Sequence, residues 1–586
     1  MRLVLVLLLA CSTAFPQSAA ILFKGKCSVC HHAGSGTRAP LPQVLRRMSR
    51  NSILTALETG RMKPLAAGLN HDQLEAIANY LGMPDQPALT TRSGDCLGDP
   101  PPMSDAPGWV GWGGDIANTR FQPANVAGLD PAKISKLKLK WAFGFPGASS
   151  ASAQPSITGG RVFEGSEDGT VYALDAASGC TIWKFKAKSM IRSAVSVGAH
   201  ALFFGDVQAN VYAVNRENGA LLWCTRAEDF PTARITGSPA LYENRLFVPV
   251  SSGEEGSAMD PSYECCKFRG SVVALEIEGG KQLWKTYVIA DAPRPTTRNS
   301  KGTQMWGPSG AAVWSAPTLD PARKRVYVAV GNDYSEPSTN SSDAVLALDM
   351  DSGSILWSRQ FTAGDRWNLA CVNPDKANCP KEAGPDFDFG ASPILESLQG
   401  GRSLLIAGQK SGNVYALDPD QQGKLAWESK IGRGGLLGGI EYGGASDGEY
   451  VYYPLSDWVE KDPTAGGGLF ALRMETGERA WAAPPFKPAC VGSAGCSAAQ
   501  LAPTTVIPGI VFSGSMDGHL RAYSTKDGNV LWDFDTAKEF ETVNGTKAHG
   551  GSLSQSGPAI ANGILYITSG NSMPGNVLLA FSVDGK

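Results

Sequence analysis

The sequence predicts an all-β, eight-bladed β-propeller preceded by a small all-α domain. Three features predict it: a hairpin repeat that ends in tryptophan, a glycine-rich composition with few charges, and an N-terminal segment with helical hydrophobic periodicity. The chain has 586 residues, of which 68 are glycine, 14 are tryptophan and 18% are charged. This composition is typical of a turn-rich β protein. The chain is also too long for one ordinary domain.

The repeat begins after Trp109 and reads Gly/Asn-x-Val-Tyr-Ala-Leu-Asp, a glycine turn, and then tryptophan. Each copy predicts a strand, a tight turn and a second strand, with another strand pair upstream. An eighth copy, GNVLLAFSVDGK, runs into the C-terminus. Seven copies end in tryptophan, at Trp183, Trp223, Trp284, Trp357, Trp427, Trp481 and Trp532. Four strands in each of eight copies predict an eight-bladed propeller over residues 109–586.

The propeller is expected to close through the strand KLKLKWAF around Trp141, which would complete the last blade. An open β-solenoid is the alternative. The regular position of the tryptophan at the end of the copies argues against it.

Residues 1–20 are expected to be a secretory signal peptide. Arg2 precedes a short apolar run, and small residues follow, so cleavage is expected near Ser18–Ala20. A lipoprotein-type cleavage before Cys11 is the alternative. The run is too short to span a bilayer, and no other segment is long and apolar enough. We therefore expect a periplasmic or secreted protein without a membrane span.

Residues 21–84 are expected to form the small helical domain, and residues 85–108 a Pro-rich linker. A helix is predicted over residues 70–81. Asn70 is a suitable N-cap residue, and the apolar residues that follow fall on one helical face.

The helical domain carries the motif Cys27-Ser28-Val29-Cys30-His31. In Cys-x-x-Cys-His, two thiols form thioethers to haem and the imidazole binds the iron. A metal knuckle or a redox dithiol is the alternative. Met62 is expected to be the second axial ligand, with Met48 and Met83 as the alternatives. The segment is therefore predicted to be a cytochrome c domain with one covalent haem c, whose iron is bound by His31 and Met62.

Twelve cysteines are typical of an oxidising compartment. Without Cys11 and the two motif cysteines nine remain, so one should stay unpaired. The expected pairs are Cys96–Cys180, Cys371–Cys379 and Cys490–Cys496, with Cys224 left free. Cys265 and Cys266 are adjacent. The net charge of −3, without a basic run, argues against a nucleic-acid partner.

Several stretches carry a family resemblance: GWGGDIANTRFQP from Gly111, SSGEEG from Ser251, CCKFRGSVVAL from Cys265, VWSAPTLD with VAVGN, DFDFGASP, GQKSGNVYALD and PGNVLLAF. From Trp109 to Lys586 the chain resembles the quinoprotein alcohol dehydrogenases. These are propellers that bind pyrroloquinoline quinone (PQQ) and calcium, and the polyvinyl alcohol dehydrogenase-like group is the most similar. Fusion to a cytochrome c segment also occurs among such enzymes. PQQ and Ca²⁺ are implied by this resemblance alone.

The resemblance implies a calcium site and an aromatic side chain on which the quinone ring stacks. Glu255, which ends Ser-Ser-Gly-Glu-Glu, and Asn332, in Val-Gly-Asn, are implied as calcium ligands. Calcium prefers such oxygen ligands. Trp314 is implied to stack beneath the quinone ring. Lys410, in Gly-Gln-Lys-Ser-Gly, is implied to contact the quinone oxygens.

Further cofactor-binding residues are implied by the same resemblance: Arg192, Arg269, Thr236 and Gly253. The chain departs from the family at Ser152, where many relatives place a glutamate against the quinone. That departure weakens any assignment of this particular contact.

The catalytic base is implied by the family pattern Asp-x-Trp-Asp. Here Asp365-Arg366-Trp367 is followed by Asn368, and then by a cysteine-bearing insert. If the insert splits the motif, Asp386 takes the base position and also binds the metal. Asp388 is the second candidate for the base and Asp365 the third. A carboxylate can accept the hydroxyl proton of an alcohol.

Together these features predict a quinohaemoprotein dehydrogenase that oxidises alcohols, in particular secondary alcohols or polyvinyl alcohol-like polyols. A soluble cytochrome or a respiratory-chain component would accept the electrons. Two alternatives are a PQQ-dependent aldose dehydrogenase and a non-catalytic propeller scaffold with an attached haem. The pair Cys265-Cys266 resembles the vicinal disulfide of quinoprotein dehydrogenases, and a surface-loop staple is its alternative.

Overall fold

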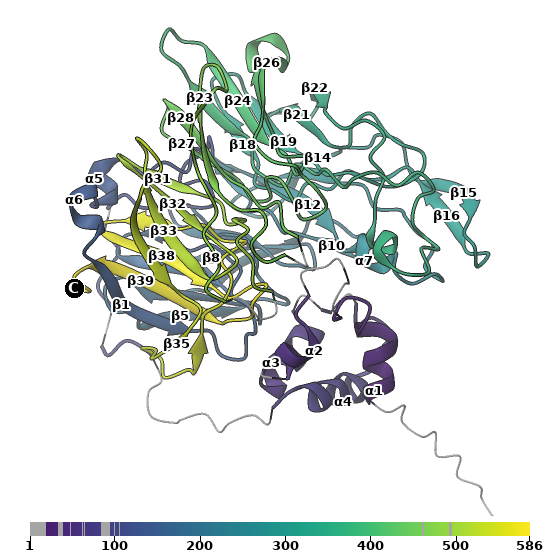
Figure 1. The fold of residues 1–586 in the computed structure, drawn as a ribbon, viewed down its shortest axis with the longest axis horizontal. Helices are drawn as coiled ribbons and strands as arrows, with labels where there is room; N and C mark the ends of the chain where they lie inside the picture. Colours follow the sequence, from purple (N-terminus) through teal and green to yellow (C-terminus); the bar gives the residue numbers. More distant parts are fainter. Residues whose placement is uncertain are drawn as a thin grey trace, which may run out of the picture.

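The computed structural model describes residues 19–586, except 33–34, 36–38, 47, 61, 64, 84–93, 99, 105, 460–461 and 491–494. The predicted signal peptide and Cys11 therefore lie outside the described residues. Eight antiparallel sheets of four or five strands form the predicted propeller, and a helical segment lies against one side of it (Figure 1). No helix among the described residues has the length and apolar character needed to cross a membrane.

Each blade consists of strands that are consecutive in the sequence, except the one that closes the ring. The first four blades are β2 (Ser156–Thr158), β3 (Arg161–Gly165), β4 (Thr170–Asp175) and β5 (Thr181–Lys186); β6 (Ser196–Val197), β7 (Ala201–Gly205), β8 (Asn210–Asn215) and β9 (Leu221–Arg226); β10 (Ala233–Arg234), β11 (Ala240–Tyr242), β12 (Arg245–Ser252), β13 (Ser271–Glu276) and β14 (Gln282–Tyr287); β18 (Thr318–Asp320), β19 (Arg325–Ala329), β21 (Ala344–Asp349) and β22 (Ile355–Gln360).

The next three blades follow the same order, and the eighth combines the two ends of the propeller chain. They are β23 (Ile394–Ser397), β24 (Ser403–Gly408), β25 (Asn413–Asp418) and β26 (Lys424–Lys430); β27 (Ala445–Ser446), β28 (Tyr450–Pro454), β29 (Leu469–Arg473) and β30 (Arg479–Ala483); β31 (Thr505–Ile507), β32 (Ile510–Gly514), β33 (His519–Ser524) and β34 (Val530–Asp535); β37 (Ala559–Ala561), β38 (Ile564–Ser569), β39 (Val577–Val583) and β1 (Leu137–Gly144).

Small strand pairs and short helices decorate the blades. They are β15 (Arg294–Arg298) with β16 (Gln304–Gly307), β17 (Ser309–Gly310) with β20 (Asp333–Ser335), β35 (Glu539–Phe540) with β36 (Ala548–His549), α5 (Ala124–Ala127), α6 (Pro131–Ile134), α7 (Glu254–Ser257), and the 3-10 turns Leu369–Val372 and Pro419–Gln421.

The ring closes as the sequence predicts. β1 pairs antiparallel with β39, from Leu137 opposite Val583 to Gly144 opposite Val577. The strand that contains Trp141 thus becomes the fourth strand of the last blade, so the two ends of the propeller chain are joined in one sheet.

The repeat tryptophans join each blade to the next. The indole nitrogen of Trp183 donates to the carbonyl oxygen of Arg216 at 3.2 Å. Its ring covers Gly219, where a Cβ would lie 2.5 Å from the ring and where φ is +72°. Glycine is therefore required at this turn both for its conformation and for the close approach. The same pairing recurs for Trp141 with Gly179, Trp223 with Gly280, Trp284 with Gly353, Trp357 with Gly423, Trp427 with Gly477 and Trp481 with Gly528.

The N-terminal segment has its own small core. Its elements are α1 (Ala19–Leu22), a π-helical turn (Phe23–Cys27), α2 (Pro42–Leu45), α3 (Arg50–Glu58) and α4 (His71–Leu81). The Asn70 side chain accepts from the Gln73 N–H at 2.9 Å, and the Gln73 side chain accepts from the Asn70 N–H at 3.0 Å. This capping box confirms the predicted helix and its N-cap.

Four disulfides are present: Cys96–Cys180, Cys265–Cys266, Cys371–Cys379 and Cys490–Cys496. Cys224 lies outside them, so the predicted pairings are confirmed. Cys265 and Cys266 are fully buried, which makes the surface-loop staple alternative wrong. Cys96 anchors the middle of the predicted linker to the first blade through Cys180.

Candidate active site

Four loops meet at one side of the propeller, which we call the mouth. Three connect the second and third main strands of a blade: β12 to β13, β19 to β21, and β24 to β25. The fourth, residues 361–393, connects β22 to the next blade. Because strands alternate in direction within a blade, all four connections leave at the same side. Residues from distant parts of the sequence therefore converge there.

Lys410 is the centre of a buried charge cluster at the mouth. Its Nζ donates to Oδ2 of Asp386 at 2.9 Å and to Oδ2 of Asp388 at 3.2 Å. All three residues are at most 7% exposed. Burial lowers the pKa of Lys410, but the two carboxylates outweigh burial and hold this pKa well above its ordinary value. The ammonium therefore stays protonated. It lies 6.0 Å from the centre of the Trp314 ring.

The two ends of the insert lie together. The carboxylate of Asp365 accepts from the backbone N–H groups of Asp386 at 3.2 Å and Phe387 at 2.7 Å. Asp386 has a left-handed backbone with φ of +62°, which costs free energy in a residue other than glycine. Asp365 supports this backbone. The residues between them form an excursion that Cys371–Cys379 closes.

The three aspartates differ in which oxygens are occupied. Both oxygens of Asp365 accept from backbone N–H groups. Asp388 accepts from the Asn332 N–H at 2.7 Å with Oδ1 and from Lys410 with Oδ2. Asp386 uses only Oδ2, so among the described residues its Oδ1 has no hydrogen-bond partner. Burial raises the pKa of Asp386 well above its ordinary value, and Lys410 opposes this shift.

Asn332 presents an amide oxygen that nothing in the described part of the chain satisfies. Its Nδ2 donates to the carbonyl oxygens of Asp333 and Trp367, both at 2.8 Å. The Oδ1 atom is buried and without a partner among the described residues. A buried amide oxygen held in one orientation is available to a ligand or a cation.

Glu255 lies in the same charge cluster. Burial and then the charge of Asp388 raise the pKa of Glu255 to about 8, against the opposing effects of Lys410 and Arg234. Oxygens from Glu255, Asn332 and Asp386 are the kind that calcium prefers. No group of three or more His, Cys, Asp or Glu side chains is placed to hold a metal among the described residues. The oxygen set at the mouth instead combines two carboxylates with an amide.

Trp314 and the vicinal disulfide pack on the same apolar cluster, so the disulfide is part of the mouth and not of a surface loop. The Trp314 ring covers Gly390, where any Cβ would clash with it, and it meets Tyr442 edge-on at 5.9 Å between ring centres. The buried carboxylate of Glu254 accepts from the N–H groups of Lys267 at 2.7 Å and Phe268 at 2.8 Å, which positions the chain beside the disulfide.

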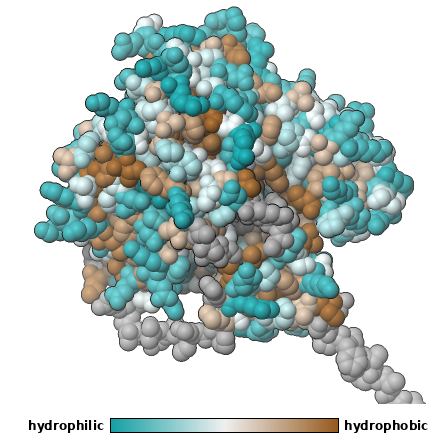
Figure 2. Space-filling model, in the orientation of Figure 1, coloured by the Kyte–Doolittle hydropathy of each residue, from teal (hydrophilic) through white to brown (hydrophobic). Residues whose placement is uncertain are grey.

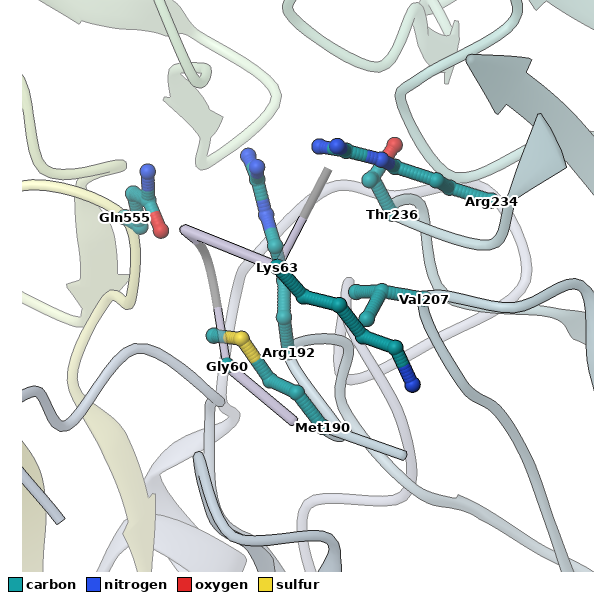
Figure 3. Close-up of a pocket in the computed structure, with 8 residues that line it drawn as sticks. All are labelled: Gly60, Lys63, Met190, Arg192, Val207, Arg234, Thr236 and Gln555. Carbon is teal, nitrogen blue, oxygen red and sulfur yellow. The ribbon is translucent and has the colours of Figure 1, made fainter. Parts of the chain in front are cut away.

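A cavity of about 180 Å³ opens beside these loops (Figure 3). Arg192 and Thr236, both implied by the family resemblance, line it. Burial and then the nearby Arg192 lower the pKa of Arg234 to about 10. Gly253 does not line the cavity: it packs against the Arg234 guanidinium, which a Cβ there would clash with. Arg234 and Gln555 also line the cavity and were not singled out from the sequence, because no local motif marks either of them.

One predicted cofactor-binding residue, Arg269, is engaged elsewhere. The Arg269 guanidinium donates to the carbonyl oxygens of Ile289 at 3.1 Å and Ala290 at 2.9 Å and lies 3.9 Å from the Tyr287 ring centre. The structure therefore does not bring Arg269 to the cavity. Ser152 accepts from Nδ2 of Asn571 at 2.9 Å, a short polar contact where many relatives place a longer acid.

The Cys-x-x-Cys-His motif follows the π-helical turn of the N-terminal segment. Nδ1 of His31 lies 2.6 Å from the carbonyl oxygen of Pro40, which can only accept, so Nδ1 is the donor and carries the proton. Cys27, Met48 and Met62 pack against the apolar core of the segment. Met83 is 49% exposed, which disfavours it as an axial ligand.

An eight-bladed propeller with buried lysine, carboxylates and an open amide at its mouth defines the class of quinoprotein-like dehydrogenases. A family model described as "Glucose/ethanol/alcohol dehydrogenase, beta-propeller domain" matches residues 224–428. A second model, "Outer membrane protein assembly factor BamB", matches residues 122–307 and 410–586. The two overlap, so both describe the propeller repeats.

Curated relatives are more specific. The chain is 42% identical to the polyvinylalcohol dehydrogenase of Pseudomonas sp, over 97% of this chain and 94% of the relative. It is 40% identical to the polyvinylalcohol dehydrogenase of Sphingopyxis sp. (strain 113P3), over 96% and 92%. The chain therefore belongs to the PQQ-dependent alcohol dehydrogenase family.

The solved structure of the quinohemoprotein alcohol dehydrogenase from Comamonas testosteroni superposes with a TM-score of 0.61 at 17% identity, over 83% of this chain and 82% of that one. A europium-containing methanol dehydrogenase gives 0.60 at 17% identity, over 81% and 98%. At such identities the likeness shows the fold, and it confirms the predicted propeller.

Proposed function

We propose that this chain is a quinohaemoprotein dehydrogenase. It oxidises secondary alcohols or polyvinyl alcohol-like polyols with PQQ and Ca²⁺ and passes the electrons to a c-type haem on its own N-terminal segment. The observation that carries this proposal is the buried cluster in which Lys410 binds Asp386 and Asp388 beside the open amide oxygen of Asn332. The two polyvinylalcohol dehydrogenases support the substrate class.

The aspartate with an open oxygen is the proposed general base. Asp386 keeps Oδ1 available, while Lys410 holds Oδ2 and Asp365 holds the backbone. A carboxylate placed within hydrogen-bond reach of an alcohol can accept its proton as the alcohol is oxidised. The protonated Lys410 opposes the effect of burial on the pKa of Asp386 and so favours the ionised form, which can accept that proton.

The mouth fits the cofactors that the family uses. Glu255, Asn332 and Asp386 would hold Ca²⁺, and Trp314 would form the floor beneath a flat ring. When bound, PQQ supplies a two-electron acceptor and Ca²⁺ a Lewis acid. Arg192 and Thr236 would contact the polar edge of the cofactor from the cavity.

The N-terminal segment fits a covalent haem. Cys27 and Cys30 would carry the thioethers, and His31 and Met62 would bind the iron. His31 is held for this role by its hydrogen bond to Pro40. We place the protein in the periplasm or outside the cell, where a soluble cytochrome or a respiratory-chain component would take the electrons.

The haem proposal has a direct test. Acid-acetone extraction should leave the haem on the protein, and Met62→Ala should lower the reduction potential and open the sixth coordination site. Met83→Ala is the matched control, since Met83 is exposed, and it should leave the potential unchanged. Haem that passes into the solvent would contradict covalent attachment.

The substrate proposal is tested with apoprotein that is reconstituted with PQQ and Ca²⁺. Secondary alcohols, diols, aldoses and polyvinyl alcohol are added in turn, and reduction of the haem is followed by its absorption bands. We expect reduction with secondary alcohols or polyvinyl alcohol, and only when both additions are present. Reduction by aldoses alone would favour the sugar dehydrogenase. Failure to bind PQQ would favour the scaffold.

A further inference from the structure

The helical segment touches the mouth through the loop between α3 and α4. The carbonyl oxygen of Thr59 accepts from Oγ of Ser189 at 3.1 Å and from the N–H of Met190 at 3.4 Å. Leu65 lies against Gly256, where a Cβ would be 3.0 Å from a Leu65 methyl carbon. Gly256 directly follows Glu255, so this loop rests on the chain that carries a proposed calcium ligand.

The loop also forms part of the cavity wall. Gly60 and Lys63 come from the helical segment, while Arg192, Arg234 and Thr236 come from the propeller. Figure 3 shows the guanidinium groups of Arg192 and Arg234 close together, while the Lys63 side chain runs past Val207 with its ammonium directed away from them. The cavity is therefore a composite of two parts of the chain that the sequence places far apart.

The charge of the cavity indicates its ligand. Three lining side chains are basic, Lys63, Arg192 and Arg234, and none of the described lining residues is acidic. The mutual repulsion of Arg192 and Arg234 contributes to the lowered pKa of Arg234. Basic side chains that line one cavity without an acidic neighbour in its wall favour an anion that carries several carboxylates. PQQ is such a polycarboxylate.

We propose that Lys63 is a cofactor-binding residue that the helical segment supplies to the propeller site. This inference rests on the proposed function, and it adds that the PQQ site is incomplete until the segment docks. Cofactor binding and docking then stabilise one another, because a ligand that binds the docked form better must shift the equilibrium toward it. Met62, the proposed iron ligand, lies in the sequence between wall residues Gly60 and Lys63, so the same contact brings the haem loop to the cofactor.

The test compares Lys63→Met with Lys63→Arg in the full-length haem protein. Lys24→Met is the matched control, because Lys24 is exposed on the same segment. PQQ affinity of the apoprotein is measured by tryptophan fluorescence at fixed Ca²⁺. We expect Lys63→Met to weaken PQQ binding about tenfold, equivalent to about 1.4 kcal/mol. Lys63→Arg should stay within about threefold, because the charge is kept, and Lys24→Met should match the wild type.

A second measurement tests the linkage. Amide hydrogen exchange in the peptide around Thr59–Lys63 should slow when PQQ is added to the wild type, and slow less in Lys63→Met. Inorganic phosphate is the probe for general anion binding and should not reproduce this protection. Equal protection by phosphate, or unchanged PQQ affinity in Lys63→Met, would overturn the inference. A wild-type protein that binds no PQQ would instead overturn the proposed function.

Discussion

The outer rim of the propeller, by which we mean the contacts of the repeat tryptophans between blades, and the mouth are built from the same repeat. They differ in whether their contacts recur from blade to blade. At the rim, a tryptophan covers a glycine of the next blade, and this pairing recurs from blade to blade. At the mouth, the loops differ in length and bring single residues such as Lys410 and Asn332 together once. A repeated contact stabilises the scaffold, whereas function depends on the places where the repeat is broken.

The two regions also differ in how well their polar groups are satisfied. At the rim, most repeat indoles donate to a carbonyl oxygen of the next blade, as Trp183 and Trp427 do. At the mouth, Asn332 Oδ1 and both carboxyl oxygens of Asp343 are buried without partners among the described residues. Burial, with Asp388 nearby, raises the pKa of Asp343 well above its ordinary value. Buried polar atoms without partners lower the stability of the folded protein, and at the mouth they leave oxygens available to a ligand. Elsewhere on the surface, Figure 2 shows polar side chains with hydrophobic ones scattered among them in small groups.

The largest expected effect lies at the mouth. Asp386→Asn should reduce turnover by about 10²–10⁴-fold with PQQ retained, because the proton acceptor is lost. Asp365→Asn and Asp388→Asn are the comparison variants and should lose less, since their oxygens hold backbone N–H groups and Lys410. Steady-state kinetics with PQQ content measured on each variant checks this order. If Asp386→Asn kept full activity, the role of general base would instead be assigned to the aspartate whose variant loses turnover.

At the rim, the expected effect is on stability and not on turnover. Trp183→Ala removes both the packing on Gly219 and the indole hydrogen bond, which should cost about 3–5 kcal/mol of the free energy of unfolding. Trp183→Phe keeps a ring and should cost less. Denaturant midpoints give the loss, and turnover per folded molecule should be unchanged. A change in turnover without a change in midpoint would erase the distinction between rim and mouth.

Calcium binding should show a smaller effect at the mouth. Asn332→Ala removes the open amide oxygen, and Glu255→Gln replaces a charged ligand with a neutral one. Each should raise the Ca²⁺ concentration that half-maximal PQQ retention requires by about 10–100-fold. Titration of the apoprotein with Ca²⁺ measures this. Identical titration curves for both variants and the wild type would remove these two residues from the metal site.

The smallest expected effect concerns a titrating pair away from the Lys410 cluster. A hydrogen bond from His519 to Asp533, 2.6 Å long, raises the pKa of His519. A raised folded-state pKa means that this contribution to stability is fully present below the unfolded pKa of about 6.5. It is lost as pH rises through the folded value. His519→Gln should therefore flatten the fall in stability from pH 6 to pH 8, as measured by thermal unfolding, while turnover is unchanged. An unaltered pH profile would contradict the assignment.

Much of the fold could be predicted because its signals are local. The capping box at Asn70 lies within four residues, and each copy of the repeat carries its hairpin turn and its tryptophan in the same order. The disulfides Cys371–Cys379 and Cys490–Cys496 close short loops. Each of these features depends on residues that are near in the sequence, so pattern and spacing are enough.

The sequence by itself determined the propeller, the closing strand around Trp141 and the haem-type motif, because each is encoded in a short or periodic segment. Only the tertiary structure decided which aspartate keeps an open oxygen, that Arg269 turns away, and that Lys63 lines one cavity with Arg234. These contacts join loops from separate blades and from the helical segment. Their geometry follows from how rigid elements pack in space, and no local pattern in the sequence records that packing.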